Sequence, residues 1–136
     1  MVPTDDLKIE CCRALIVTGD AYLKLAKKEA EVEYCKSAIK AYEEALKFIE
    51  IDRNVIPGII TTQLKLIEAY IILVKVENKK ENYENALKVM LEVFKVLRKS
   101  VSEGYLDHHK HRSLLSLLEG LYERLIDKMR EAGYDL

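Results

Sequence analysis

The chain has 136 residues, of which 49% are hydrophobic and 33% are charged, with only five glycines and two prolines. This composition is too apolar for intrinsic disorder, and the length suits a single domain that forms a hydrophobic core without disulfides or a structural metal. Lys and Arg total 22 against 23 Asp and Glu, so the basic excess of a nucleic-acid-binding domain is missing and we expect no nucleic-acid partner.

Apolar residues recur at spacings of three and four along almost the whole chain, as at Cys35, Ala38, Tyr42 and Ala45. This spacing places them on one face of an α-helix. We therefore expect an all-α fold of about five antiparallel helices and no strands. In chain order, the predicted helices span residues 5–29, 32–51, 55–77, 81–99 and 103–132.

The sequence repeats itself at an offset of 48 residues. Residues 20–29 align with residues 68–77, including the pair Ala-Tyr, and the N-cap residues Asn54 and Ser102 are also 48 apart. The repeat predicts one domain made of two helical hairpins, followed by a capping helix that begins a third copy. These three units span residues 5–51, 55–99 and 103–132.

The break between the first two predicted helices rests on the repeat alone. Residues 29–33 contain neither glycine nor proline, which are the usual signals for a turn. Without this break, residues 5–51 would form one very long helix.

Each copy resembles the tetratricopeptide repeat, in which small residues allow close helix crossing. The first copy has Gly19 three residues before Tyr22, and then the spacing Ala-x3-aromatic-x2-Ala. The distance from Tyr22 to Ala38 is 16 residues, longer than in the family, so we expect elongated hairpins. The second copy keeps Tyr70 and Ala86 and replaces the other motif residues with Ile67, Met90 and Val93.

The family resemblance implies a non-catalytic protein–protein interaction scaffold that needs no cofactor. In the family, the first helix of each repeat lines an inner face that holds a peptide or helix of a partner. In the first copy this face corresponds to Arg13, Ile16, Asp20, Leu23 and Lys24. The second and third copies contribute Thr61, Leu64, Glu68, Ile71, Ile72, His109, Arg112, Ser116, Glu119 and Gly120.

The chemistry of this inner face favours some partners over others. Family members that clamp a C-terminal carboxylate carry Lys and Asn at four positions that are Ile16, Asp20, Leu64 and Glu68 here, so that mode is disfavoured. An apolar strip beside acidic residues suits an amphipathic basic helix.

Two other interpretations of the same apolar residues remain open. Leu23, Ile71 and Ile72 also suit packing within the domain. Alternatively, Ile71 and Ile72 suit a homodimer interface that buries them, because so few repeats form only a shallow groove.

Residues 107–111, Asp-His-His-Lys-His, have the character of metal ligands. On a helix, His108 and His111 lie one turn apart and Asp107 lies four residues before His111, so two or three of these side chains face one way. The main alternative function is therefore a small metal-dependent enzyme centred on this cluster. The other interpretation is the polar start of a helix.

The cysteines and the apolar runs bear on the compartment. Cys11, Cys12 and Cys35 cannot all pair within one chain, and we expect Cys11 and Cys35 to be buried and Cys12 to be more exposed. The first six residues lack the features of a signal peptide, and the longest apolar run, residues 69–74, is too short to cross a bilayer. We therefore expect a cytoplasmic protein with no membrane partner.

Overall fold

The computed structural model describes residues 5–48 and 56–134. The predicted end of the second helix at residue 51 and the predicted cap Asn54 lie outside these residues. Within the described residues there are five helices and no strand, which confirms the all-α fold. The helices are α1 (Asp5–Lys28), α2 (Val32–Lys47), α3 (Ile56–Val76), α4 (Lys80–Ser102) and α5 (His108–Glu131).

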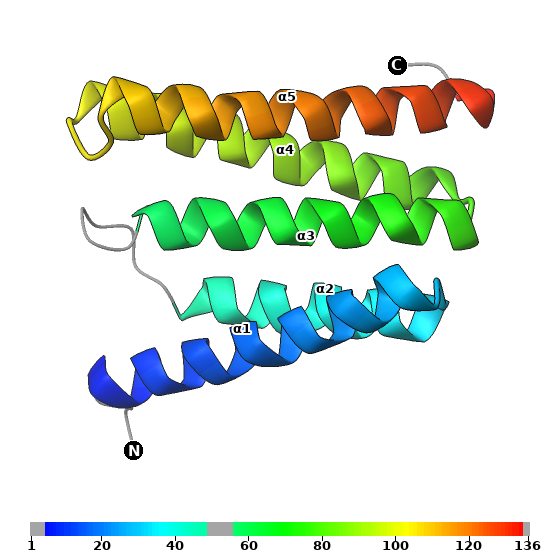
Figure 1. The fold of residues 1–136 in the computed structure, drawn as a ribbon, viewed down its shortest axis with the longest axis horizontal. Helices are drawn as coiled ribbons and strands as arrows, with labels where there is room; N and C mark the ends of the chain where they lie inside the picture. The colour runs from blue at the N-terminus through cyan, green and yellow to red at the C-terminus, as the bar shows by residue number, and fades with distance from the viewer. Residues whose placement is uncertain (1–4, 49–55, 135–136) are drawn as a thin grey trace.

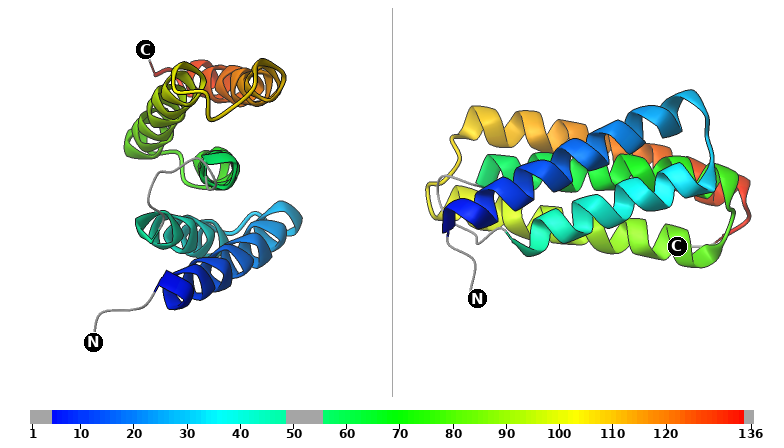
Figure 2. Two further views of the ribbon diagram at one scale, coloured as in Figure 1. Left: turned by 90° about the vertical axis from the view of Figure 1, so that its left-hand side faces the viewer. Right: turned by 90° about the horizontal axis from the view of Figure 1, so that it is seen from below.

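The helices stack in sequence order, and each one runs antiparallel to the one before it (Figure 1). The pair α1 and α2 lies at one end of the stack and the pair α4 and α5 at the other, with α3 between them (Figure 2). α3 contacts all four other helices. Its strongly apolar sequence suits this central place, since Ile60, Ile67 and Ile71 are completely buried.

The predicted break between the first two helices is confirmed, and both hairpin turns use the same backbone hydrogen bonds. In the first turn the Glu29 amide donates to the Leu25 carbonyl and the Glu31 amide donates to the Glu29 carbonyl, each at 2.7 Å. Both bonds recur 48 residues later, from Glu77 to Leu73 at 2.7 Å and from Lys79 to Glu77 at 2.9 Å.

Burial follows the same period as the sequence. Ala38 and Ala86 are both fully buried, and Tyr22 and Tyr70 both pack in or against the core. Buried residues at matching positions are what two hairpins with the same apolar spacing produce. Seven pairs of residues 48 apart are buried in both copies, namely 19 with 67, 23 with 71, 26 with 74, 35 with 83, 38 with 86, 42 with 90 and 45 with 93.

The boundary between the last two helices differs from the prediction. Ser102 was expected to cap the fifth helix, but it ends α4, where its hydroxyl donates to the Lys99 carbonyl at 3.1 Å. Gly104 then adopts a φ of +74°, a left-handed conformation that favours glycine and stops the helix. The cap of α5 is Asp107 instead, so this helix begins at His108, five residues later than expected.

Gly19 allows α1 and α2 to approach closely. A Cβ atom added at Gly19 would lie 2.6 Å from Cε1 of Tyr42, nearer than such contacts occur. Tyr42 is completely buried, and its hydroxyl donates a hydrogen bond to Asp20 at 2.6 Å, so its ring has little room to move. The small residue in the Gly-x2-Tyr motif is therefore required by the position of the Tyr42 ring.

We predict that Gly19→Ala destabilises the protein although alanine favours helix formation. The overpacking against Tyr42 costs about 1–3 kcal/mol, which outweighs a helix-propensity gain of about 1 kcal/mol. The matched control is Gly120→Ala in α5, where an added Cβ meets nothing within 4 Å. This variant should gain about 0.5–1 kcal/mol. Urea unfolding of both variants tests the prediction, and a Gly19→Ala protein as stable as the wild type would contradict it.

Candidate functional site

The apolar residues predicted to line the inner face lie mostly inside the domain. Leu23, Leu64 and Ile71 are exposed by only 5%, 8% and 0% of their surface. Ile16 and Ile72 are half-buried, and Ile72 packs against the core. These positions agree with packing within the domain, and the first three residues offer almost no surface to a partner or a second copy.

Two of the three acidic residues of the same face, Asp20 and Glu68, form ion pairs within the chain. Lys65 Nζ lies 3.0 Å from Asp20 Oδ1, which also accepts the hydrogen bond from Tyr42. Lys27 Nζ lies 3.0 Å from Glu68 Oε2. These lysines offset two of the three charges on which the expectation of a basic partner helix rested, whereas Glu119 is exposed.

The remaining predicted residues are exposed side chains without a common cluster. Arg13 forms an ion pair with Glu10 one turn earlier in α1, at 3.4 Å and with both side chains largely in solvent. Such a pair contributes little to stability. The exposed residues of the predicted face are Arg13, Lys24, Thr61, His109, Arg112, Ser116, Glu119 and Gly120.

The hydroxyl of Tyr42 titrates in an environment that opposes its ionisation. Burial raises the pKa of Tyr42, and the hydrogen bond to Asp20 and the negative charge of Asp20 raise it further. Tyr70, whose hydroxyl donates to Glu43 at 3.0 Å, also has a raised pKa, mainly because of burial and then because of the Glu43 charge. Both phenols are therefore held in the neutral form.

We predict that the stability of the protein falls at alkaline pH and that Tyr42 contributes to this fall. Its pKa is higher in the folded state than in the unfolded state, so its stabilising effect is complete below about pH 10 and is lost as the pH rises further. At pH 7, Tyr42→Phe should cost about 1 kcal/mol for the lost hydrogen bond. Unfolding measured along the pH scale should show this difference shrinking above pH ~10; a constant difference would contradict the prediction.

The cluster at residues 107–111 forms the start of α5. An Asp107 side-chain oxygen accepts a hydrogen bond from the Lys110 amide at 2.7 Å, as an N-cap residue does. His108 and His109 are exposed, whereas His111 is half-buried. Across residues 5–48 and 56–134, no three His, Cys, Asp or Glu side chains are placed to hold a metal ion.

We predict that Asp107 matters for the stability of α5. Asp107→Ala should lower the free energy of unfolding by about 1 kcal/mol, because the cap is lost. Asp107→Asn should retain most of the stability, because asparagine also caps helices well. Thermal unfolding of the two variants checks this, and an equal loss for both substitutions would argue against a capping role.

Two of the three cysteines have weakly acidic thiols. Burial raises the pKa of Cys35, which is completely enclosed by the core, and also that of Cys12. Cys35 is buried as expected, whereas Cys11 and Cys12 are both half-buried and all three are free thiols. A raised pKa makes Cys12 and Cys35 poor nucleophiles.

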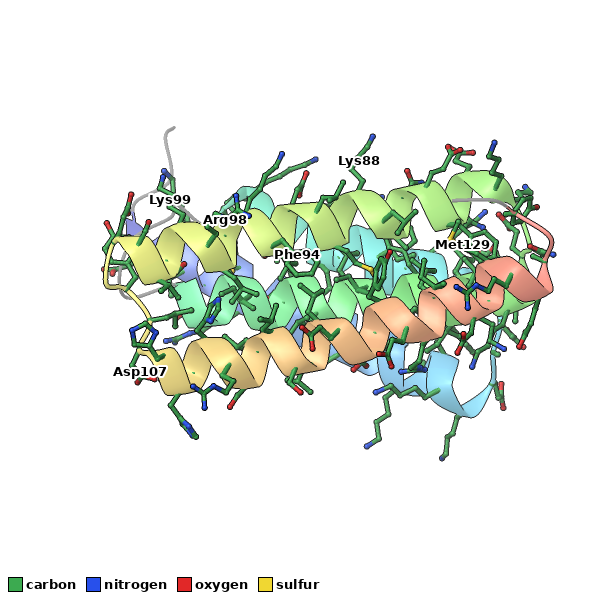
Figure 3. The ribbon with its side chains drawn as sticks, turned by 90° about the horizontal axis from the view of Figure 1, so that it is seen from above. Lys88, Phe94, Arg98, Lys99, Asp107 and Met129 are labelled. Atoms are coloured by element: carbon green, nitrogen blue, oxygen red, sulfur yellow. The ribbon has the colours of Figure 1, made fainter. Side chains whose placement is uncertain are left out.

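The structure contains a groove between α4 and α5, and of the residues predicted for the inner face only Glu119 lines it. Its volume is about 870 Å³. Leu91 and Phe94 of α4 open into it and remain 61% and 38% exposed; Figure 3 looks onto this face, with Phe94 labelled. The lining residues are Leu91, Phe94, Lys95, Leu97, Arg98, Val101 and Ser102 from α4, and His111, Leu115 and Glu119 from α5.

Two differences between the repeated copies in the sequence indicate this groove. Leu91 stands 48 residues after the exposed Glu43, so an apolar side chain replaces a charged one on the surface. On the other wall, Glu119 is the counterpart of the completely buried Ile71. Comparing the copies residue by residue therefore identifies the α4 and α5 surface that lines the groove.

Comparison of the chain with protein-family models, with curated proteins and with solved structures finds no match. The helices of the described residues include none that is long and apolar enough to cross a membrane.

Proposed function

We propose that the protein is a non-catalytic protein–protein interaction module of tetratricopeptide-like type, and that it binds a helix or peptide of a partner in the groove between α4 and α5. The observation that carries this proposal is the apolar lining of that groove. Leu91 and Phe94 remain exposed there, although α5 lies directly beside them.

Burial of these side chains supplies the driving force for binding. Each square ångström of apolar surface removed from water contributes about 25 cal/mol. A groove bordered by two antiparallel helices has the shape that accepts an amphipathic helix. The proposal thus keeps the interaction role expected from the family resemblance and moves the binding surface from the inner face to α4 and α5.

We further propose that the protein works in a reducing compartment such as the cytoplasm. Its three cysteines are free thiols, and no disulfide joins the described residues. Free, partly buried thiols are typical of reducing compartments.

Two leucines of equal exposure allow a controlled test of the groove. Leu91 lines it and is 61% exposed, whereas Leu117 of α5 is 60% exposed and is not among the lining residues. Replacing either with aspartate should change the free energy of unfolding by less than about 0.5 kcal/mol, because both are surface positions.

We predict that peptides selected from a display library on the folded protein carry apolar residues at helical spacing. Their binding should weaken by about tenfold or more, about 1.4 kcal/mol, in Leu91→Asp and should persist in Leu117→Asp. Fluorescence anisotropy with the selected peptides measures this. Equal losses in the two variants, or selected peptides without a helical pattern, would argue against the groove as the binding site.

A further inference from the structure

The α4 edge of the groove is basic, and its charges have no partner among the described residues. Lys95 and Arg98 are three residues apart, so they lie one turn apart on one side of the helix. Both line the groove and are exposed, and within the described part of the chain neither forms an ion pair or a side-chain hydrogen bond. By contrast, Lys65 beside α1 is held by Asp20.

The α5 wall of the groove corresponds to a face that a helix covers in the other two copies. In the first copy this face packs on the second helix of the hairpin, as the contact between Gly19 and Tyr42 shows. In α5 the equivalent residues are half-buried or exposed, because no described helix packs over them. The equivalent sets are Gly19, Leu23 and Ala26 in α1, then Ile67, Ile71 and Val74 in α3, and Leu115, Glu119 and Tyr122 in α5.

From these two observations we propose that the groove binds an acidic amphipathic helix of a partner protein. The apolar side of that helix packs between Leu91, Phe94 and Leu115. In the first copy the counterpart of Leu115, Gly19, is likewise covered by the second helix of its hairpin. Its carboxylates pair with Lys95 and Arg98. This inference rests on the proposed function and specifies the chemistry of the partner.

The charged side chains that line the groove favour an acidic partner over a basic one. Two of the three acids that suggested a basic helix, Asp20 and Glu68, form ion pairs with lysines of the same chain. At the groove itself, Lys95 and Arg98 outnumber the single carboxylate, Glu119. Opposite charges at the rim of an interface increase the association rate and select the partner, and salt weakens both effects.

Two synthetic peptides provide a direct test. Both are capped at each end and about 20 residues long, so that they form helices in isolation. Both carry the same leucines at helical spacing, and one has glutamates and the other lysines along one edge. We expect the glutamate peptide to bind at least about tenfold more tightly in calorimetry, with an advantage that shrinks as salt is added.

Charge-reversal variants test whether the preference for the glutamate peptide comes from the basic residues of the groove. Arg98→Glu should weaken the glutamate peptide by about tenfold and strengthen the lysine peptide. The control is Lys88→Glu, an exposed α4 residue outside the groove lining, which points away from α5 in Figure 3. This control should leave both affinities unchanged. Amide chemical shifts should change in residues 91–102 and 111–119.

The outcomes separate this inference from the proposed function. If the lysine peptide binds as tightly or more tightly, and Leu91→Asp removes that binding, the acidic partner is wrong and the interaction groove stands. If neither peptide binds, both proposals fail. If sedimentation shows a dimer that Leu91→Asp dissociates, a second copy occupies the groove and the acidic-helix inference is overturned.

Discussion

The burial of most of α3 between the two ends of the stack is the constraint on which the rest of the structure depends. An amphipathic helical hairpin cannot cover its own apolar face, so each hairpin needs a neighbour. α3 meets this need for both ends of the stack, since it contacts α1 and α2 on one side and α4 and α5 on the other. Polar interactions then fix its position. Lys65 of α3 forms an ion pair with Asp20 of α1, and the Tyr42 hydroxyl of α2 donates a hydrogen bond to the same carboxylate.

The helices were predictable because apolar spacing and the 48-residue period are local properties of the sequence. The break near residue 30 contains no glycine or proline, but the 48-residue period places it opposite the turn near residue 78, and both turns have the same backbone hydrogen bonds. The end of α4 was not predictable in the same way. There Gly104 ends α4 and Asp107 caps α5, at positions that the 48-residue period does not predict. Ser102 does not cap α5, because its hydroxyl donates a hydrogen bond to the α4 backbone.

The candidate site was harder to predict than the fold, because it depends on which side chains meet. The family resemblance assigned Leu23 and Ile71 to one inner face, but only the packing of the neighbouring helices shows that both side chains are buried. Likewise, the sequence shows Asp20 and Glu68 as acids but not the lysines that pair with them. The groove arises where Leu91 replaces the exposed Glu43 and where Glu119 replaces the buried Ile71, differences that a search for similarity passes over.

The order of the stack has a consequence for folding. Every helix contact within the described residues joins helices that are adjacent or next but one along the chain. A chain with such short-range contacts closes only small loops as it folds, which favours rapid folding. It also allows the two ends to open independently of each other, so amide hydrogens should exchange most slowly in the middle of the stack and faster toward each end.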